Sequence, residues 1–260
     1  LSSGLAISAI TDVLKGKYKN SYSLSRPPGH HCLPDYPNGF CLLANIAVAI
    51  EHSINNKLGK KFCVIDWDVH HGNGTEAIFY NRNDVLTISI HQERNYPVDT
   101  GMETHQGKQE GLGYNVNLPL PAGSGHQAYL NLFDRVIDPI VSNYSPDIII
   151  VACGFDAAMI DPLSSMLCSA ETFRLLTRKA QKLADEQCNG KLALVHEGGY
   201  SEVYVPFCGH AVLEELSGSQ IIAKDPYEEL FNLRQPGSRF ENMINEVLND
   251  SSLLVDVDTS

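Results

Sequence analysis

Short apolar runs alternate along this chain with amphipathic stretches whose apolar positions recur every three or four residues. The short β-prone runs predict buried strands, and the amphipathic stretches predict helices. Strands are expected at residues 22–24, 62–65, 85–90, 114–118, 148–152 and 192–195, and helices at residues 5–15, 42–53, 74–80, 126–144, 169–189 and 202–250. This alternation is typical of an α/β fold with a mostly parallel central sheet and helices on both faces.

Ionisable residues gather where the predicted strands end. The run at 62–65 leads into Asp66, Asp68 and His70, and the most apolar run of the chain is followed by Asp156. If the backbone stays extended, Asp68 and His70 project to the same side. A single Asp or His at such a place would more simply cap a helix or bond loop amides. Four ionisable groups within six residues, however, are costly to bury unless they bind an ion or one another.

Two further strand ends carry candidate catalytic groups. Adjacent His30 and His31 follow a Pro-Pro-Gly turn, and Tyr200 follows paired glycines. Taken alone, each would more often be a satisfied polar residue or a packing residue. Ligands of parallel α/β folds bind at the carboxyl ends of strands, which unites these residues with the Asp/His cluster in one site. The imidazoles suit acid–base work tuned by Asp66, and the Tyr200 hydroxyl suits a developing oxyanion.

The Asp/His cluster has the composition of a catalytic metal centre. Asp68, His70 and Asp156 supply two carboxylates and one imidazole, which leave an open coordination position on a divalent ion. This oxygen-rich set favours Zn²⁺ and also admits Fe²⁺ or Co²⁺. An ion held in this way acidifies water and polarises a carbonyl group, so the reaction that these residues predict is metal-assisted amide hydrolysis.

Composition and charge narrow the class of partner. The chain has 260 residues with no shift in composition, which predicts a single domain over residues 1–250 and a disordered tail at 251–260. The net charge of −12 argues against direct nucleic-acid binding and for cationic or lysine-bearing substrates. No apolar stretch approaches the roughly 20 residues of a membrane span, and no signal peptide is evident, so no membrane partner is expected.

The cysteines predict the redox compartment. All seven are scattered, and no two of them form a Cys-x-x-Cys pair. Several lie inside apolar runs, where a reduced core thiol is the expected state. A reducing cytoplasm fits this pattern best.

Several motifs together resemble the zinc-dependent histone deacetylase superfamily. They are Arg-Pro-Pro-Gly-His-His at 26–31, Asn-Gly-Phe-Cys at 38–41, Asp-Trp-Asp-Val-His-His-Gly-Asn-Gly at 66–74, Gly-Phe-Asp-Ala at 154–157 and Glu-Gly-Gly-Tyr at 197–200. The resemblance covers about residues 5–216 and is nearest to the class II branch and to bacterial histone deacetylase-like and acetylpolyamine amidohydrolases. It implies a three-layer arginase/deacetylase fold that removes acetyl or other acyl groups from acetyl-lysine or acetylpolyamines.

The resemblance also implies a role for each site residue. It makes the Asp-His-Asp set the zinc ligands, His31 the general base and acid, and His30 an electrostatic partner bonded to Asp66. Tyr200 becomes the oxyanion donor. Asn73 stands where class I relatives carry an Asp beside the second histidine, as it does in class II members.

Two further sites follow from the same resemblance. A structural K⁺ site would carry over to the side chains of Asp66 and Ser89 with the backbone carbonyls of Asp68, His70 and Ile90. The acyl-lysine tunnel would be formed by Gly39, Phe40, Tyr96, Leu163 and Gly199. Relatives also carry an upstream segment with the first strand and rim loops, which this chain is expected to lack.

Alternative functions remain at this level. A binuclear manganese ureohydrolase shares the architecture but needs further metal ligands, and after Asp156 the chain offers two alanines with only Asp161 beyond them. A catalytically impaired acyl-lysine binding module is the non-enzyme reading. The sequence also leaves homo-oligomer formation open.

Overall fold

The computed structural model describes residues 1–250, so the predicted tail at 251–260 lies outside the described residues. The strands are β1 (Asn20–Ser23), β2 (Phe62–Asp66), β3 (Val85–Gln92), β4 (Asn115–Leu120), β5 (Ile148–Cys153) and β6 (Leu192–His196). The α-helices are α1 (Ser2–Leu14), α2 (Asn45–Asn55), α3 (Asn73–Phe79), α4 (His126–Leu132), α5 (Asp138–Tyr144), α6 (Ala170–Cys188), α7 (Val205–Ser217), α8 (Glu228–Arg234) and α9 (Ser238–Asp250). A 3₁₀ turn, η1 (Gln109–Gly111), and a π-helical turn, η2 (Phe133–Ile137), complete the elements.

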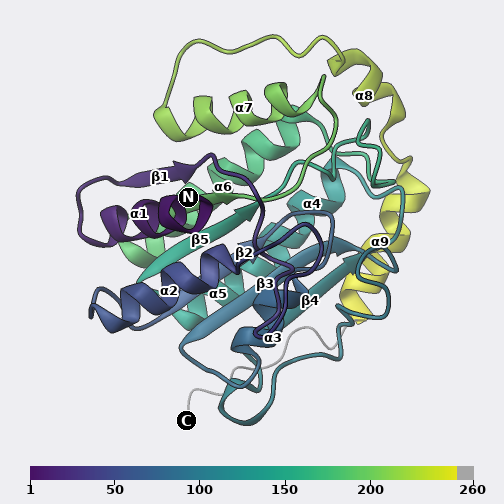
Figure 1. The fold of residues 1–260 in the computed structure, drawn as a ribbon. Coiled ribbons are helices and arrows are strands. Elements are labelled where there is room, and N and C mark those ends of the chain that lie inside the picture. The colour runs from purple at the N-terminus through teal and green to yellow at the C-terminus, as the bar shows by residue number, and fades with distance from the viewer. Residues whose placement is uncertain (251–260) are drawn as a thin grey trace.

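The strands form one six-stranded sheet in the order β1-β6-β5-β2-β3-β4. Every pairing within this described sheet is parallel. Helices lie on both faces, with α1 and α2 on one and α4, α5 and α6 on the other (Figure 1). The predicted α/β architecture is therefore confirmed. Because all strands run the same way, their carboxyl ends meet at a single edge.

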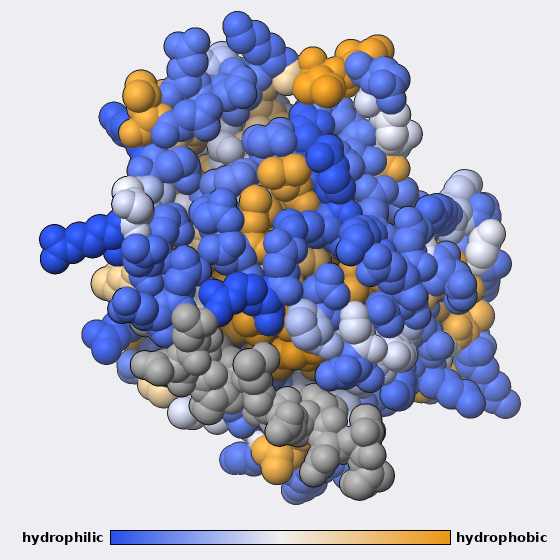
Figure 2. Space-filling view, turned by 180° about the vertical axis from the view of Figure 1, so that it is seen from behind, coloured by the Kyte–Doolittle hydropathy of each residue, from blue (hydrophilic) through white to orange (hydrophobic). Residues whose placement is uncertain are grey.

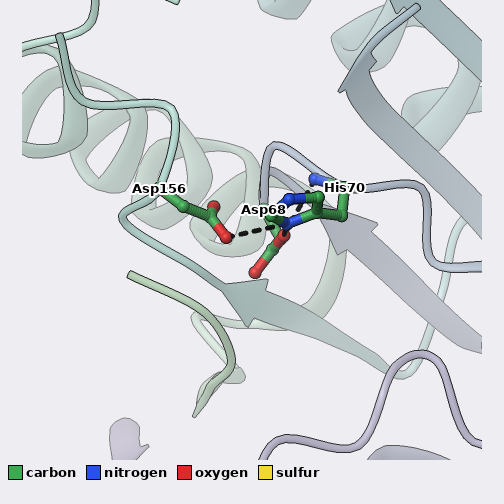
Figure 3. A group of neighbouring side chains, drawn as sticks. All are labelled: Asp68, His70 and Asp156. Atoms are coloured by element: carbon green, nitrogen blue, oxygen red, sulfur yellow. Dashed lines mark hydrogen bonds and ion pairs between the residues drawn. The ribbon is translucent and has the colours of Figure 1, made fainter. Parts of the chain in front are cut away.

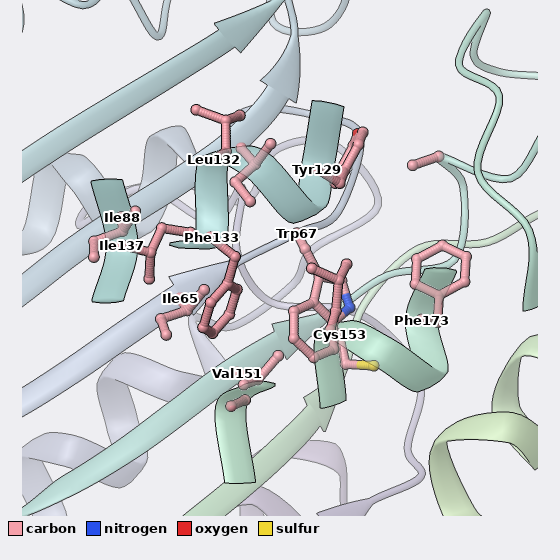
Figure 4. Close-up of a cluster of buried hydrophobic side chains, with 14 of the residues drawn as sticks. Ile65, Trp67, Ile88, Tyr129, Leu132, Phe133, Ile137, Val151, Cys153 and Phe173 are labelled. Atoms are coloured by element: carbon pink, nitrogen blue, oxygen red, sulfur yellow. The ribbon is translucent and has the colours of Figure 1, made fainter. Parts of the chain in front are cut away.

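Alternate residues of the central strands enter two separate hydrophobic cores. Val64 packs with α1 and α2, whereas its neighbour Ile65 packs with the helices of the other face. On that second face Ile65 and Val151 lie beside Phe133, with Trp67 on the other side of the Phe133 ring from Ile65 (Figure 4). Strands buried on both faces must be apolar at successive positions, which is why they read as continuous hydrophobic runs. Each fully buried aliphatic side chain contributes roughly 1.5–3 kcal/mol.

Several predicted element boundaries need correction. The helix expected from residue 42 begins at Asn45, because Asn38 and Cys41 first close a tight turn through paired backbone hydrogen bonds. The helix expected at 126–144 is interrupted by the π-helical turn η2. The region 202–250 is not continuously helical: Gly218, at a left-handed φ of 66°, caps α7, and helix resumes only at Glu228.

The surface and the cysteines agree with the composition. Seen from behind, the molecule is mostly hydrophilic, with hydrophobic residues exposed in scattered places (Figure 2). All seven cysteines are free and buried, as predicted for reduced core thiols. Among the helices of residues 1–250, none combines the length and the apolar character that a bilayer crossing requires.

Candidate metal centre and active site

The loop after β2 brings its acidic residues to the edge of the sheet through two successive Asx turns, in which an Asp side chain accepts a backbone N–H two residues further on. Asp66 Oδ1 accepts the backbone N–H of Asp68 at 3.1 Å, and Asp68 Oδ1 accepts that of His70 at 2.9 Å. The strand therefore ends at Asp66, so the condition of an extended backbone through Asp68 and His70 is not met. The side-chain alternation survives, because Trp67 and Val69 still enter the hydrophobic core while the polar residues face the site.

Glycines and backbone amides fix the two carboxylates that face His70. A Cβ atom at Gly154 would lie 2.1 Å from Asp68 Oδ2, and one at Gly198 would lie 2.2 Å from Asp156 Oδ2. The Gly198 N–H also donates to Asp68 Oδ2 at 2.7 Å, and the Val69 N–H donates to Asp156 Oδ1 at 2.8 Å. Glycine is thus required by close approach, and any side chain there would displace a carboxylate.

Asp68, His70 and Asp156 converge on one point, as Figure 3 shows. His70 Nδ1 lies 3.1 Å from Asp68 Oδ1 and 3.0 Å from Asp156 Oδ2, and the three candidate ligand atoms all lie within 4.8 Å of one another. Ligand atoms about 2.0–2.2 Å from a tetrahedral ion are about 3.3–3.6 Å apart, so the spacing fits one small cation. All three residues are buried.

The charge of this set also fits a cation. Burial and the neighbouring Asp68 raise the pKa of Asp156 to about 7. Burial alone would lower the pKa of His70, but hydrogen bonds to Asp156 and Asp68 raise it to about 10. Two buried carboxylates therefore hold positive charge strongly at this point. A divalent ion that displaces the imidazole proton would satisfy them, and Zn²⁺, Fe²⁺ and Co²⁺ all accept such ligands.

The adjacent histidines have different partners and opposite pKa shifts. His30 Nδ1 lies 2.9 Å from Asp66 Oδ2, whereas His31 Nδ1 lies 2.8 Å from Asn73 Oδ1. Burial opposes the charge on His30, but Asp68 and Asp66 outweigh it and raise its pKa well above 6.5. Burial and the nearby His30 lower the pKa of His31 to about 2. One imidazole is thus held protonated and the other neutral, with ring centroids 4.0 Å apart.

A third carboxylate, Glu197, anchors the loop that carries these histidines. Glu197 Oε2 accepts the backbone N–H of Gly29 at 2.6 Å and that of His30 at 3.0 Å. Burial raises the pKa of Glu197 to about 7. Glu197 belongs to the Glu-Gly-Gly-Tyr motif at 197–200, but the sequence alone predicted no role for it. Its position directly after an apolar strand and before paired glycines is the signal that could have marked it.

A cavity of about 440 Å³ opens above the metal centre. It is lined by His31, Gly39, Phe40, His70, Asn95, Tyr96, Leu163 and Tyr200. This set contains most of the predicted tunnel residues and adds Asn95. Gly199 is not among the lining residues: a Cβ atom there would lie 3.1 Å from the side chains of Phe155 and Val205, and the residue, at φ 125°, turns the chain towards Tyr200.

The two long walls of the cavity are joined at its mouth. Gly39 and Phe40 both have positive φ angles, 49° and 64°, in the tight turn between Asn38 and Cys41. This turn presents Phe40 with 71% of its surface exposed. The Tyr96 hydroxyl donates to Asn38 Oδ1 at 2.8 Å and so ties the opposite wall to the same turn. The sequence predicted Tyr96 but could not show this bond between two distant loops.

Tyr200 stands between the mouth and the metal centre. Its ring centroid lies 6.0 Å from that of Phe40 and 6.3 Å from that of His70. Burial and the charge of Asp68 raise the pKa of its hydroxyl, so the group stays protonated and can donate.

Of the residues predicted for a K⁺ site, Asp66 and Ser89 are paired in register on β2 and β3.

Comparison with known proteins agrees with this geometry. The family model of the histone deacetylase domain matches residues 1–216. The chain is 48% identical over 250 residues to a histone deacetylase-like amidohydrolase of Pseudomonas aeruginosa, covering 96% of this chain and 66% of the relative. It is 36% identical over 258 residues to a probable deacetylase of Archaeoglobus fulgidus, covering 98% of this chain and 68% of the relative.

Solved structures give the same result. The crystal structure of the HDA15 HD domain superposes with a TM-score of 0.82 at 36% identity, over 96% of this chain and 66% of that one. An acetylpolyamine aminohydrolase from Burkholderia pseudomallei superposes with a TM-score of 0.75 at 32% identity, over 84% of this chain and 62% of that one. The chain thus spans 62–68% of the length of these four relatives.

Proposed function

Because this chain belongs to the histone deacetylase family, we propose that it is a metal-dependent amidohydrolase that removes acetyl groups from acetylated amines. The observation that carries the proposal is that the cluster of three buried candidate ligands borders, through His70, a cavity that His31 and Tyr200 also line. Amide hydrolysis needs these groups together: an activated water, a base to take its proton and a donor for the oxyanion.

Asp68, His70 and Asp156 are the proposed ligands of one Zn²⁺ ion, with Fe²⁺ and Co²⁺ as alternatives. An ion at this position acidifies water and polarises the carbonyl group of the bound amide. His31 is the proposed base, because the amide oxygen of Asn73 accepts its Nδ1–H and leaves Nε2 free to take a proton.

The remaining proposed catalytic groups stabilise charge or transfer a proton. His30, held positive by Asp66, is the proposed electrostatic partner of the reaction, and His31 returns its proton to the departing amine. Tyr200 donates its hydroxyl to the oxygen that becomes negative when the acyl carbon is attacked. The proposed K⁺ site uses the side chains of Asp66 and Ser89 with the backbone carbonyls of Asp68, His70 and Ile90.

Acetyl-lysine and acetylpolyamines are the proposed substrates. None of the residues that line the cavity is a carboxylate, a lysine or an arginine, which suits the uncharged alkyl chain beside the acetylated nitrogen in both. Gly39, Phe40, Tyr96 and Leu163 form the proposed tunnel, and the negative net charge suits a cationic remainder outside it. Asn73 favours the class II branch. We further propose residues 1–250 as one catalytic domain acting in the cytoplasm.

The hydrogen bonds of Asp161 argue against a binuclear ureohydrolase. The carboxylate of Asp161 accepts backbone N–H groups from Leu163, Tyr200 and Ser201 rather than facing the metal centre. Within residues 1–250 the only cluster with metal-ligand spacing is the Asp-His-Asp set. One divalent ion per chain is therefore the proposal.

The experiment is release of acetate by the metal-loaded protein from an acetyl-lysine peptide and from acetylspermidine, measured side by side with and without a hydroxamate chelator. We expect release that the chelator abolishes, and the faster substrate then distinguishes protein from polyamine deacetylation. Folded, metal-loaded protein that releases acetate from neither substrate would contradict the proposal.

A further inference from the structure

Asp161 is a buried carboxylate that the proposed chemistry does not use. It is 5% exposed and lies in the loop after β5. Its Oδ2 accepts the backbone N–H of Tyr200 at 2.6 Å and that of Ser201 at 3.3 Å, and its Oδ1 accepts that of Leu163 at 2.9 Å. These bonds join two loops that are far apart in sequence, one carrying the proposed oxyanion donor and the other a wall of the cavity.

The backbone at Tyr200 needs such an anchor. It follows Gly198 and Gly199, and Gly199 has a φ of 125°, a conformation open to glycine alone. Glycines leave the chain free to take many other directions, so the direction of the Tyr200 side chain is not set by local structure. A charged acceptor on the Tyr200 N–H fixes the residue at the atom next to its Cα, and bonds to ionised acceptors are roughly twice as strong as neutral ones.

Packing alone does not replace this anchor. Tyr200 is only partly buried, because its ring borders the open cavity rather than the hydrophobic core. Its ring packs near those of Phe40, which is itself 71% exposed, and His70. The firmest contacts of this residue are therefore on its backbone side, at Asp161.

We propose that Asp161 is a positioning residue that aims the Tyr200 hydroxyl at the reacting carbonyl and locks Leu163 in the wall beside it. The inference rests on the proposed function, since Tyr200 matters only if an oxyanion develops there. Asp161 acts through Tyr200 and touches neither substrate nor metal. A displacement of about 1 Å in a catalytic group can cost up to about a hundredfold in rate.

The test is a double-mutant cycle on kcat with the acetyl-lysine peptide, using Asp161→Ala, Tyr200→Phe and the double variant. We expect Asp161→Ala to lower kcat about 30-fold in the parent protein, within the range for misplaced catalytic groups, and less than about threefold when Tyr200 is already Phe. Equal losses in both backgrounds would overturn the proposal, as would no loss in the parent. If Asp161→Ala does not fold, Asp161→Asn, which keeps one acceptor oxygen, takes its place.

A matched control separates positioning from general loss of a backbone anchor. Asp147 Oδ2 accepts the backbone N–H groups of Lys60 and Lys61 at 2.6 and 3.0 Å, just before β5 and therefore at the opposite edge of the sheet. Asp147→Ala removes a similar anchor and should leave kcat within twofold of the parent. A loss of kcat as large as that of Asp161→Ala would show that the effect is structural and would overturn the proposal.

Hydrogen exchange gives a readout that does not depend on turnover. In Asp161→Ala the amides of Tyr200 and Ser201 should exchange at least tenfold faster, while those of β6 stay protected. If the parent protein released no acetate, the proposed function would fail, yet the exchange result would still decide whether Asp161 anchors this loop. Unchanged exchange at Tyr200 would overturn the inference by itself.

Discussion

Two buried ionic clusters in this molecule differ in how their charges are matched. The first lies at the carboxyl edge of the sheet and contains Asp66, Asp68, Asp156 and Glu197 with His30 and His70. The second joins α6 to α7, where the guanidinium of Arg174 donates to Glu214 and, at 2.9 Å, to Glu171. Arg174 and Glu214 are 9% and 4% exposed, so this pair is buried like the first cluster, whereas Glu171 stays at the surface.

The two clusters differ in whether the protein itself supplies the positive charge that its buried carboxylates need. In the second, burial opposes the charge of Glu214, but the Ala223 N–H and Arg174 outweigh it and lower its pKa, so the protein supplies its own counter-charge. In the first, burial raises the pKa of both Asp156 and Glu197 to about 7. The first cluster buries more carboxylates than it has positively charged side chains to match them. A bound metal cation would supply the missing positive charge.

The largest effect is expected for Asp156→Asn, which removes one carboxylate from the first cluster. We expect acetate release to fall by more than about 10³-fold, because the ion that supplies several kcal/mol of charge stabilisation is no longer held. The metal-free protein should become more stable at pH 8. The folded-state pKa of about 7 lies above the ordinary 3.8, so the stability linked to this group is present below pH 3.8 and lost as pH rises through 7.

Thermal unfolding of chelated parent and variant at pH 8 checks the second half of this expectation. The Asn side chain keeps an acceptor for His70 but carries no charge. A variant with a lower melting temperature than the chelated parent would contradict the view that this cluster is over-supplied with negative charge.

Tyr200→Phe sharpens the contrast from the side of the reaction. In the proposed reaction the hydroxyl donates to the oxygen on which negative charge develops, so kcat should fall about 10²–10³-fold, the cost of one oxyanion donor. Zn²⁺ affinity, measured by calorimetry, should stay within twofold, because Tyr200 is not a ligand. A variant with unchanged kcat would show that Tyr200 has no part in the chemistry.

Arg174→Ala breaks the matched cluster and should affect stability rather than metal binding. It removes the guanidinium partner of the buried Glu214, which costs about 3 kcal/mol in the free energy of unfolding. The control is Arg178→Ala on the same pair of helices, where the ion pair with Glu215 is exposed and contributes at most about 1 kcal/mol. Chemical denaturation of both variants measures the difference, and equal costs would contradict the assigned burial effect.

The smallest effect is expected for Asn73→Asp, which tests whether the His31 imidazole is neutral. A carboxylate beside Nδ1 raises the pKa of His31, so the base becomes protonated at a higher pH than in the parent. The acidic limb of the profile of kcat/KM against pH should therefore move up by about one unit, with little loss at pH 8. An acidic limb that stays in place, or moves down, would show that His31 is not the group being titrated.

The sequence predicted those parts of the molecule that depend on local pattern. Continuous apolar runs identified the strands because strands covered on both faces must be apolar throughout. Ser169 is the first residue of the helix expected at 169–189, and its side chain accepts the Thr172 N–H within a capping box. The positions of Asp68, His70 and Asp156 could be predicted because all parallel strands deliver their ends to one edge.

The features that escaped prediction depend on contacts between distant segments. Glu197 and Asp161 bind backbone N–H groups, which every residue except proline carries, so no side-chain pattern marks their partners. The hydrogen bond of Tyr96 to Asn38 joins two loops whose lengths give no hint of their proximity. The buried pair of Arg174 and Glu214 resembles any two charged helix positions until α6 and α7 are packed together.

The central claim, that one divalent ion completes the unmatched cluster, is tested most directly by metal stoichiometry. The measurement is elemental analysis and calorimetric titration of chelated protein with Zn²⁺, on the parent and on Asp156→Asn. The account predicts one tightly bound Zn²⁺ per chain in the parent and none in the variant. Two ions per chain in the parent, or one ion in both proteins, would contradict it.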